Sequence, residues 1–202
     1  MKKAFFALLI ISILISCGVN QQIKQLKALE KCKYTIASAD SVYLGNIAVS
    51  SIITPQGVNL SKSPVLALAL FKQHLPFTGR LNLKIENPGN ALAGINRFEY
   101  IVLIKDFELT KGVIDQPIRI EPNGGSTIVP IKISTDIYPI IENSKNRAAL
   151  INFFNLSTEK EALITFKIKP SLTDNVEYPG YITFDKGITN KKLVSSIRDA
   201  VK

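Results

Sequence analysis

The chain has 202 residues and a formal net charge of +9, and 46% of its residues are hydrophobic. This length suits one domain with a sizeable core, and the hydrophobic content excludes the disordered, hydrophilic class of protein. One histidine and two cysteines leave little material for a clustered metal site or a disulfide framework.

The first element is a short basic start followed by an apolar run. Lys2 and Lys3 precede residues 4–15, and Leu14-Ile15-Ser16-Cys17 closes the run. The run is shorter than the about 20 apolar residues of a membrane-spanning helix, and its length suits a signal peptide. The whole order resembles a bacterial lipoprotein signal. That resemblance implies cleavage between Ser16 and Cys17 and lipid attachment to Cys17, so we expect acyl chains on Cys17 to hold the protein on a membrane.

These features divide the chain into four expected parts: a signal peptide over residues 1–16, a lipid-anchored tether over 17–30, a β domain over 31–186 and a C-terminal helical tail over 187–202. The tether is expected to run into a weakly helical segment with Ile23, Leu26 and Leu29. The lysines of the tether would either attract an anionic bilayer or merely keep a linker solvated, and we favour the second. Position 18 is glycine and the next residues are neutral. An aspartate directly after the lipidated cysteine would resemble an inner-membrane retention signal, and none is present there. The expected location is therefore the cell envelope, at the periplasmic face of the outer membrane.

From Cys32 onward the apolar residues alternate, which predicts short β-strands. Cys32 falls on the buried parity, so we expect a buried, inert thiol. Residues 98–109 carry apolar side chains on both parities, which indicates a central strand covered on both faces. Short strands with turn signals and no βαβ rhythm predict a mostly β, antiparallel β-sandwich. The expected strands are residues 32–36, 42–49, 77–86, 98–109, 117–120, 127–133, 162–168 and 181–184, with a turn at 122–125.

Three helices interrupt this pattern. Ser63 and Pro64 form a start signal for a helix over residues 65–71, with Leu66, Leu70 and Phe71 on one face. A longer helix follows with Asp136 as its N-cap, Pro139 in its first turn and apolar spacing from residue 137 to 151. A C-terminal helix is expected over residues 191–201, capped by Asn190.

One strand ends in a turn motif. Residues 81–86 alternate, and Asn87-Pro88-Gly89-Asn90 follows directly. Pro88 presets φ at the second turn position, and a glycine at the third position supplies a positive φ, so we expect a type II turn with Gly89 in the left-handed region.

This motif and the segments after it resemble the late-embryogenesis-abundant type 2 family, or WHy domain. The matching segments, in the family's order, are residues 85–88, 98–103, 109–112, 120–122 and 128–131. The chain departs from the family at Gly89, where asparagine is usual. The resemblance covers roughly residues 34–184. It implies a fibronectin- or immunoglobulin-like sandwich with a helical insertion at residues 136–154, and a non-catalytic role linked to water stress.

The sequence contains no recognisable catalytic constellation, so we expect no enzyme and no cofactor. His74 lacks a neighbouring nucleophile motif and is interpreted as a loop residue. Asp106, Glu108 and Asp115 are scattered, with no metal-ligand spacing among them. We also expect no nucleic-acid partner, because no recognition motif is present.

Three functions compete at this point. The first is a tethered, protective envelope lipoprotein, which the resemblance favours. The second is an adaptor that binds an envelope protein through a sheet edge or through apolar helix faces at residues 66–71 and 137–151. The third is a carrier of a small apolar ligand, which the sequence supports least because no polar anchoring residues converge.

Overall fold

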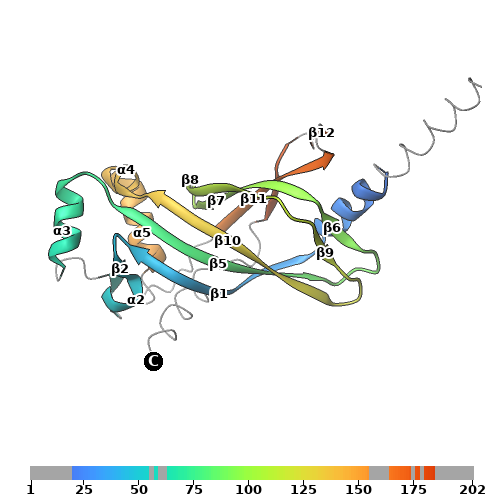
Figure 1. Ribbon diagram of the computed structural model, residues 1–202, viewed down its shortest axis with the longest axis horizontal. Coiled ribbons are helices and arrows are strands. Elements are labelled where there is room, and N and C mark those ends of the chain that lie inside the picture. Colours follow the sequence, from blue (N-terminus) through green and yellow to red (C-terminus); the bar gives the residue numbers. More distant parts are fainter. Residues whose placement is uncertain are drawn as a thin grey trace, which may run out of the picture.

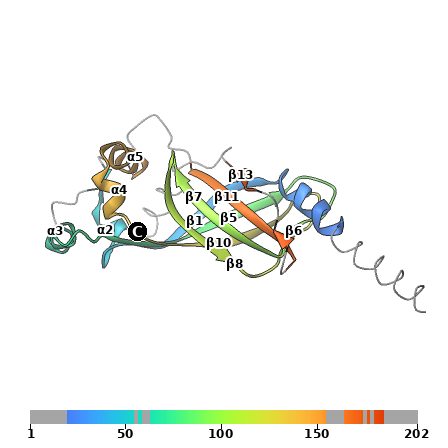
Figure 2. The same ribbon diagram turned by 90° about the horizontal axis from the view of Figure 1, so that it is seen from above.

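Two antiparallel sheets pack face to face in the computed structural model and enclose one hydrophobic core (Figure 1; Figure 2). The structure describes residues 20–54, 57–58, 63–154, 164–173, 176–177 and 180–184. Within these ranges the first sheet has the order β10-β5-β1-β2. The second has the order β12-β11-β7-β8, with β13 also paired to β11. The predicted mostly β, antiparallel sandwich with a helical insertion is confirmed.

A helix over residues 20–29 comes before the first strand. Two small ladders, β3-β4 and β6-β9, lie outside the main sheets. The remaining bounds are β1 (Lys33–Leu44), β2 (Ile47–Ala48), α2 (Val49–Ile52), β3 (Ile53–Thr54), β4 (Gly57–Val58), α3 (Pro64–Phe71), β5 (Pro76–Asn87), β6 (Ala93–Ile95), β7 (Arg97–Ile104), β8 (Phe107–Ile114), β9 (Ile118–Ile120), β10 (Gly125–Asp136), α4 (Tyr138–Glu142), α5 (Ser144–Phe154), β11 (Ile164–Thr173), β12 (Val176–Glu177) and β13 (Ile182–Phe184).

The first sheet is built on the alternation that the sequence showed. In β5 the side chains of Leu81, Leu83 and Ile85 are buried, and those between them are partly exposed. Strand β1 is one strand, whereas the alternation predicted two. Its register shifts after Ile36 and again after Asp40, with Ser41 at a φ of 52°. At each bulge the side chains that face the core change between even-numbered and odd-numbered residues. The apolar alternation is therefore interrupted within one continuous strand.

In the second sheet the predicted long strand over residues 98–109 is wrong in its extent. The chain turns at Lys105 and Asp106 and returns as β8, so the segment is a hairpin. Lys105 adopts a φ of 54°, which the sequence did not signal because neither turn residue is glycine or proline. The predicted central position is confirmed for β7, which lies between β8 and β11. The predicted cover on both faces is wrong, because Ile101 and Leu103 are only partly buried and Glu99 is exposed.

Helix α3 forms where the start signal placed it. The Leu66 N–H donates to Ser63 Oγ at 3.4 Å, and Pro64 occupies the first turn. Leu66 is buried and Leu70 packs partly against the core. Phe71 was expected on that same face, but its side chain is 85% exposed, because the helix turns that position away from the sandwich.

The helical insertion contains two helices where one was predicted. Helix α4 ends at Glu142, Asn143 leaves the helical region at a ψ of 118°, and α5 begins at Ser144. Asn143 Oδ1 accepts from the N–H groups of Lys145 and Asn146 at 3.0 and 3.2 Å. That side-chain bond competes with helix continuation and caps a new helix instead. Asp136, predicted as the N-cap, is the last residue of β10.

Helix 20–29 lies at the end of the long axis opposite α3, α4 and α5 (Figure 1). It buries Leu26 and Leu29 in the core. Tyr34 Oη donates to the Leu29 carbonyl at 2.7 Å, and so satisfies one of the free carbonyls at the helix end. Most of the predicted tether over residues 17–30 is therefore a docked helix. The predicted signal peptide, residues 162–163 and the tail over 187–202 lie outside the described residues.

Candidate functional site

The predicted turn motif contains a buried and fully hydrogen-bonded polar side chain. Asn87 ends β5 with only 1% of its surface exposed. Its Nδ2 donates to the carbonyls of Ala91 and Ile120 at 2.8 and 3.1 Å, and its Oδ1 accepts from the Gly89 N–H at 3.0 Å. One amide group thus satisfies three backbone groups, which is what a buried asparagine needs to be stable.

The turn itself differs from the predicted type II turn. Gly89 is not among the residues with a positive φ, so the left-handed conformation expected there is wrong. The bond from the Gly89 N–H to Asn87 Oδ1 instead closes an Asx-turn, in which a side chain replaces the backbone acceptor. A Cβ atom at Gly89 would lie 3.2 Å from Asn87 Oδ1, so glycine here relieves crowding around that oxygen.

A second turn packs onto the first. The Gly124 N–H donates to the Asn87 carbonyl and the Asn123 N–H donates to the Gly89 carbonyl, both at 2.7 Å. This confirms the predicted turn at residues 122–125. We call the two turns, with the end of β9, the Asn87 junction. Sequence reasoning found Asn87, Pro88 and Gly89 but missed Ile120, because its carbonyl is 33 residues away and carries no sequence signal.

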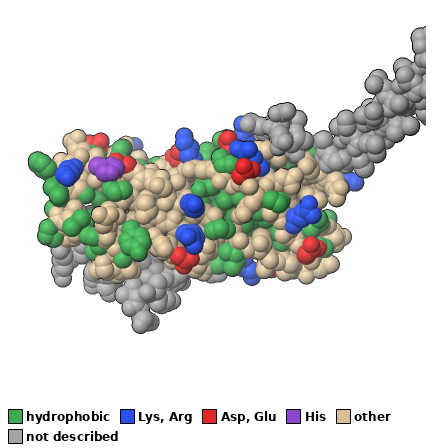
Figure 3. Space-filling view, in the orientation of Figure 1, with side chains coloured by type: hydrophobic (Ala, Val, Ile, Leu, Met, Phe, Trp, Pro, Cys, Tyr) green, Lys and Arg blue, Asp and Glu red, His purple; other side chains and the backbone are tan. Residues whose placement is uncertain are grey.

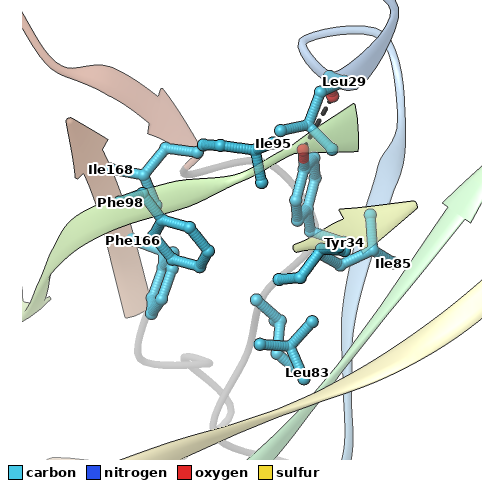
Figure 4. Close-up of a pocket in the computed structure, with 10 residues that line it drawn as sticks. Leu29, Tyr34, Leu83, Ile85, Ile95, Phe98, Phe166 and Ile168 are labelled. Atoms are coloured by element: carbon cyan, nitrogen blue, oxygen red, sulfur yellow. Dashed lines mark hydrogen bonds between the residues drawn. The ribbon is translucent and has the colours of Figure 1, made fainter. Parts of the chain in front are cut away.

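A small cavity lies between the two sheets (Figure 4). Its volume is about 10 Å³, room for one water molecule. The lining is apolar and aromatic, and the Tyr34 hydroxyl turns to Leu29. Pockets for small molecules usually occupy roughly 300–1,000 Å³. This cavity therefore gives the predicted apolar-ligand carrier no support.

Cys32 precedes Tyr34, a residue that lines this cavity, by two positions in the sequence. Its side chain is buried, as predicted. Its Sγ is 3.5 Å from the Ala28 carbonyl. Burial raises the pKa of the Cys32 thiol to about 11. Since the thiolate is the reactive species, Cys32 stays protonated and inert at neutral pH.

His74 and Asp136 join the loop after α3 to the end of β10. His74 lies in that loop, as predicted, and its Nδ1 is 2.8 Å from Asp136 Oδ2. Asp136 Oδ1 also accepts from the Leu75 and Tyr138 N–H groups at 2.8 and 3.0 Å. Burial works to raise the pKa of the Asp136 carboxyl, but these hydrogen bonds and the charge of His74 outweigh it and lower the pKa below its usual value.

Acid is expected to remove the stabilisation that Asp136 provides. Because its folded-state pKa is lowered, the carboxylate stabilises the fold above the unfolded-state pKa of 3.8, and this is lost as the pH falls through the folded-state pKa. Urea unfolding of wild type and Asp136→Asn should differ at about pH 7, and the difference should shrink steadily as the pH is lowered below 3.8. Asp115→Asn is the control, since Asp115 is 72% exposed and lies 3.8 Å from Arg97. A pH-independent gap for Asp136→Asn would contradict this interpretation.

The other carboxylates that the sequence singled out do not converge. Asp106 lies in the β7–β8 turn, and Glu108 lies on β8 with Oε1 3.8 Å from Lys111 Nζ. Across the part of the chain that the structure describes, no group of three or more His, Cys, Asp or Glu side chains could hold a metal ion. None of the described helices is both long enough and apolar enough to cross a bilayer. Ser16 and Cys17 lie outside the described residues.

An exposed apolar row runs along α3. Val65, Leu68 and Phe71 are 51%, 52% and 85% exposed, and their spacing places them on one helix face. We call these three residues the α3 row. Figure 3 shows hydrophobic side chains at this end of the molecule, with the histidine and a few charged side chains beside them. The sequence missed the row because α3 is apolar all round and its pattern does not separate buried from exposed positions.

Comparisons with known proteins yield distant structural likenesses, two of which are a solution structure and a crystal structure. No family model and no curated protein matches the chain. A solution structure of a protein provisionally described as late embryogenesis abundant is 14% identical, with a TM-score of 0.30, and the match covers 93% of this chain and 87% of that one. A crystal structure of a protein from Archaeoglobus fulgidus is 15% identical, with a TM-score of 0.27, over 55% of this chain and 86% of that one. At these values, function has to be argued from the chain's own residues.

Proposed function

We propose that this protein is a non-catalytic lipoprotein of the bacterial cell envelope, anchored through Cys17, that protects other macromolecules during water stress. The observation that carries the stress-related part is the Asn87 junction. Asn87, the first residue of the turn motif on which the family resemblance rests, is 1% exposed and bonds to three backbone groups. A residue so deeply used for structure fits a shared architecture better than a chance turn.

The anchoring part rests on the sequence from Lys2 to Cys17. Each buried CH₂ of an acyl chain contributes about 0.8 kcal/mol, and more than one chain is needed for stable attachment. Gly18 and Val19 separate Cys17 from the docked helix. Since one residue spans at most about 3.6 Å, the folded domain is held close to the bilayer. We propose the periplasmic face of the outer membrane as the location.

Replacement of the lipidated residue tests the anchor. Cys17→Ala is expected to abolish lipid attachment and to release the protein, or to leave it with an uncleaved signal, because alanine has no thiol to carry an acyl chain. Membrane fractionation and intact-mass measurement of wild type and variant check this. Cys32→Ala is the matched control and should stay lipidated and membrane-bound. A Cys17→Ala protein that is processed and fractionates like wild type would overturn the anchoring.

The protective role has its own experiment. Cells that lack the protein should survive drying or osmotic shock less well than wild type, and wild-type protein supplied in trans should restore survival. Complementation with Cys17→Ala separates the fold from its location, because the domain keeps its core while it loses the anchor. Unchanged survival of the deletion strain would sink the protective role and leave the anchor untouched.

The adaptor alternative needs a contact surface. Two residues on the helix faces first considered, Leu70 and Ile141, pack against the core. Aspartate at either position would therefore disturb folding as well as any contact. Among the helical residues whose side chains the structure describes, those of α3 include the large hydrophobic ones that are more than half exposed, and this row is considered next.

A further inference from the structure

The α3 row is an exposed apolar surface, with no partner among the residues that the structure describes. No charged residue occurs from Ser63 to Phe71, and the side chain of Phe71 is 85% exposed. The opposite side of α3 holds Leu66 in the core, so the helix is fixed with this row outward. A contiguous exposed apolar surface on a folded domain usually marks a contact with a protein or a membrane.

The chemistry of the row favours lipid over protein. A stable protein interface buries about 800 Å² per partner and is anchored by Tyr, Trp or Arg, whereas the row consists of two aliphatic residues and one phenylalanine on a single eight-residue helix. Helix α3 lies at one end of the molecule, beyond the ends of the strands (Figure 1). Lipid chains adapt to such a convex apolar surface without shape complementarity.

The charges next to the row also suit a bilayer. Lys72 follows Phe71 directly and is exposed, so it can extend its ammonium toward lipid head groups while the row lies deeper. Asp136, which binds His74 in the loop after α3, is paired with that histidine and with two backbone N–H groups. That pairing reduces the repulsion between the Asp136 carboxylate and an anionic membrane surface.

We propose that the α3 row inserts into the same lipid bilayer that holds the acyl chains of Cys17. This inference rests on the proposed anchoring, since a tethered domain meets its own membrane at high effective concentration and weak insertion then suffices. Helix 20–29 and α3 lie at opposite ends of the long axis (Figure 1). Two contacts at opposite ends place the long axis along the membrane surface.

The chain has no tryptophan, so Phe71→Trp adds a single fluorescent reporter at the row. The probe is the protein as the cell processes it from the full chain, in vesicles of phosphatidylethanolamine and phosphatidylglycerol, some with brominated acyl chains. We expect blue-shifted emission and quenching by the brominated lipid. Val113→Trp, at a 48% exposed position on β8, is the matched control and should emit as in water. Leu68→Asp in the Phe71→Trp protein should abolish the quenching, with circular dichroism verifying the fold.

The outcomes separate this inference from the anchoring. Pelleting with vesicles, together with quenching of the Phe71→Trp protein but not of the Val113→Trp protein, supports insertion. A Phe71→Trp protein that pellets but emits as in water overturns the inference and leaves the anchoring intact. Equal quenching of the Phe71→Trp and Val113→Trp proteins has the same meaning. So does quenching that appears only when the brominated lipid is in other vesicles than those that hold the protein. A partner protein that covers α3 in native membranes would likewise overturn the inference, because the row would then contact protein instead of lipid. Failure to pellet, with Cys17 unmodified, overturns the anchoring and this inference together.

Discussion

Asn87→Ala is expected to lower the free energy of unfolding by about 3 kcal/mol, because it leaves the buried Ile120 carbonyl and the part-buried Ala91 carbonyl without their donor and opens a space beneath the turn. Nδ2 of Asn87 donates to Ala91 and Ile120, and its Oδ1 accepts from Gly89. A lost bond at a hydrated surface is replaced by water, whereas this residue is 1% exposed. Urea unfolding, followed by circular dichroism, measures the change.

The matched control is Asn82→Ala on the same strand. Asn82 also donates two hydrogen bonds, to Ser38 Oγ at 2.7 Å and to Asp40 Oδ2 at 2.5 Å, but it lies on the partly exposed face of β5. Water can replace these bonds, so we expect a loss of about 1 kcal/mol or less. Equal losses for the two alanine variants would show that burial of Asn87 does not carry the effect.

Asn87→Asp separates the donated bonds from the packing. Aspartate has nearly the same shape and keeps the acceptor for the Gly89 N–H, but when ionised it has no donors for the two carbonyls. We expect it to be at least as destabilising as alanine at neutral pH, since a buried charge would face two carbonyl oxygens. An aspartate variant close to wild type in stability would mean that shape alone holds the Asn87 junction.

Gly112→Ala is the second substitution with a large expected effect. Gly112 on β8 pairs with Tyr100 on β7, and a Cβ atom there would lie 2.5 Å from Tyr100 Oη and 2.6 Å from Cζ. The ring cannot yield freely, because Tyr100 Oη donates to the Lys132 carbonyl at 2.8 Å and the ring stacks on Phe166 at 6.0 Å. We expect a loss of about 2–4 kcal/mol in urea unfolding, from overpacking and the broken hydrogen bond.

Gly79→Ala provides the comparison, because Gly79 also lies within a strand. Its Cβ would meet Val42 Cγ2 at 3.4 Å, an ordinary contact, so we expect no loss of stability or a small gain. A Tyr100→Leu background should also reduce the cost of Gly112→Ala, since the atoms that clash are then absent. Additive costs in that double-mutant cycle would refute the proposed clash.

The sequence predicted those elements whose cause is local. Ser63 and Pro64 start α3 by bonds within one turn, and β5 alternates because one of its faces is buried along its length. The β7–β8 turn and the α4–α5 break depend on Lys105 at a positive φ and on an asparagine cap at residue 143. Neither the turn nor the helix break contains a glycine or proline. The apolar periodicity on both sides of each therefore predicted one continuous element.

The candidate site divides in the same way. Asn87 could be found because an Asn-Pro-Gly turn has a sequence signature, but its main partners could not, since Ile120 comes near only when β9 packs beside the end of β5. The α3 row was hidden for a related reason. Which side of an all-apolar helix faces the sandwich is decided by neighbours that are distant in the sequence, and Phe71 proved to lie on the outside.

The bond between Tyr34 and the Leu29 carbonyl bears on how the domain could be shed from a membrane. A protease needs several residues of extended chain in its cleft, and here Leu26 and Leu29 are already part of the core. Cleavage within residues 20–29 would first require undocking of that helix, which exposes apolar surface and breaks the 2.7 Å bond from Tyr34. The stability of the sandwich therefore protects its own attachment, and conditions that loosen the core should also speed its release by proteolysis.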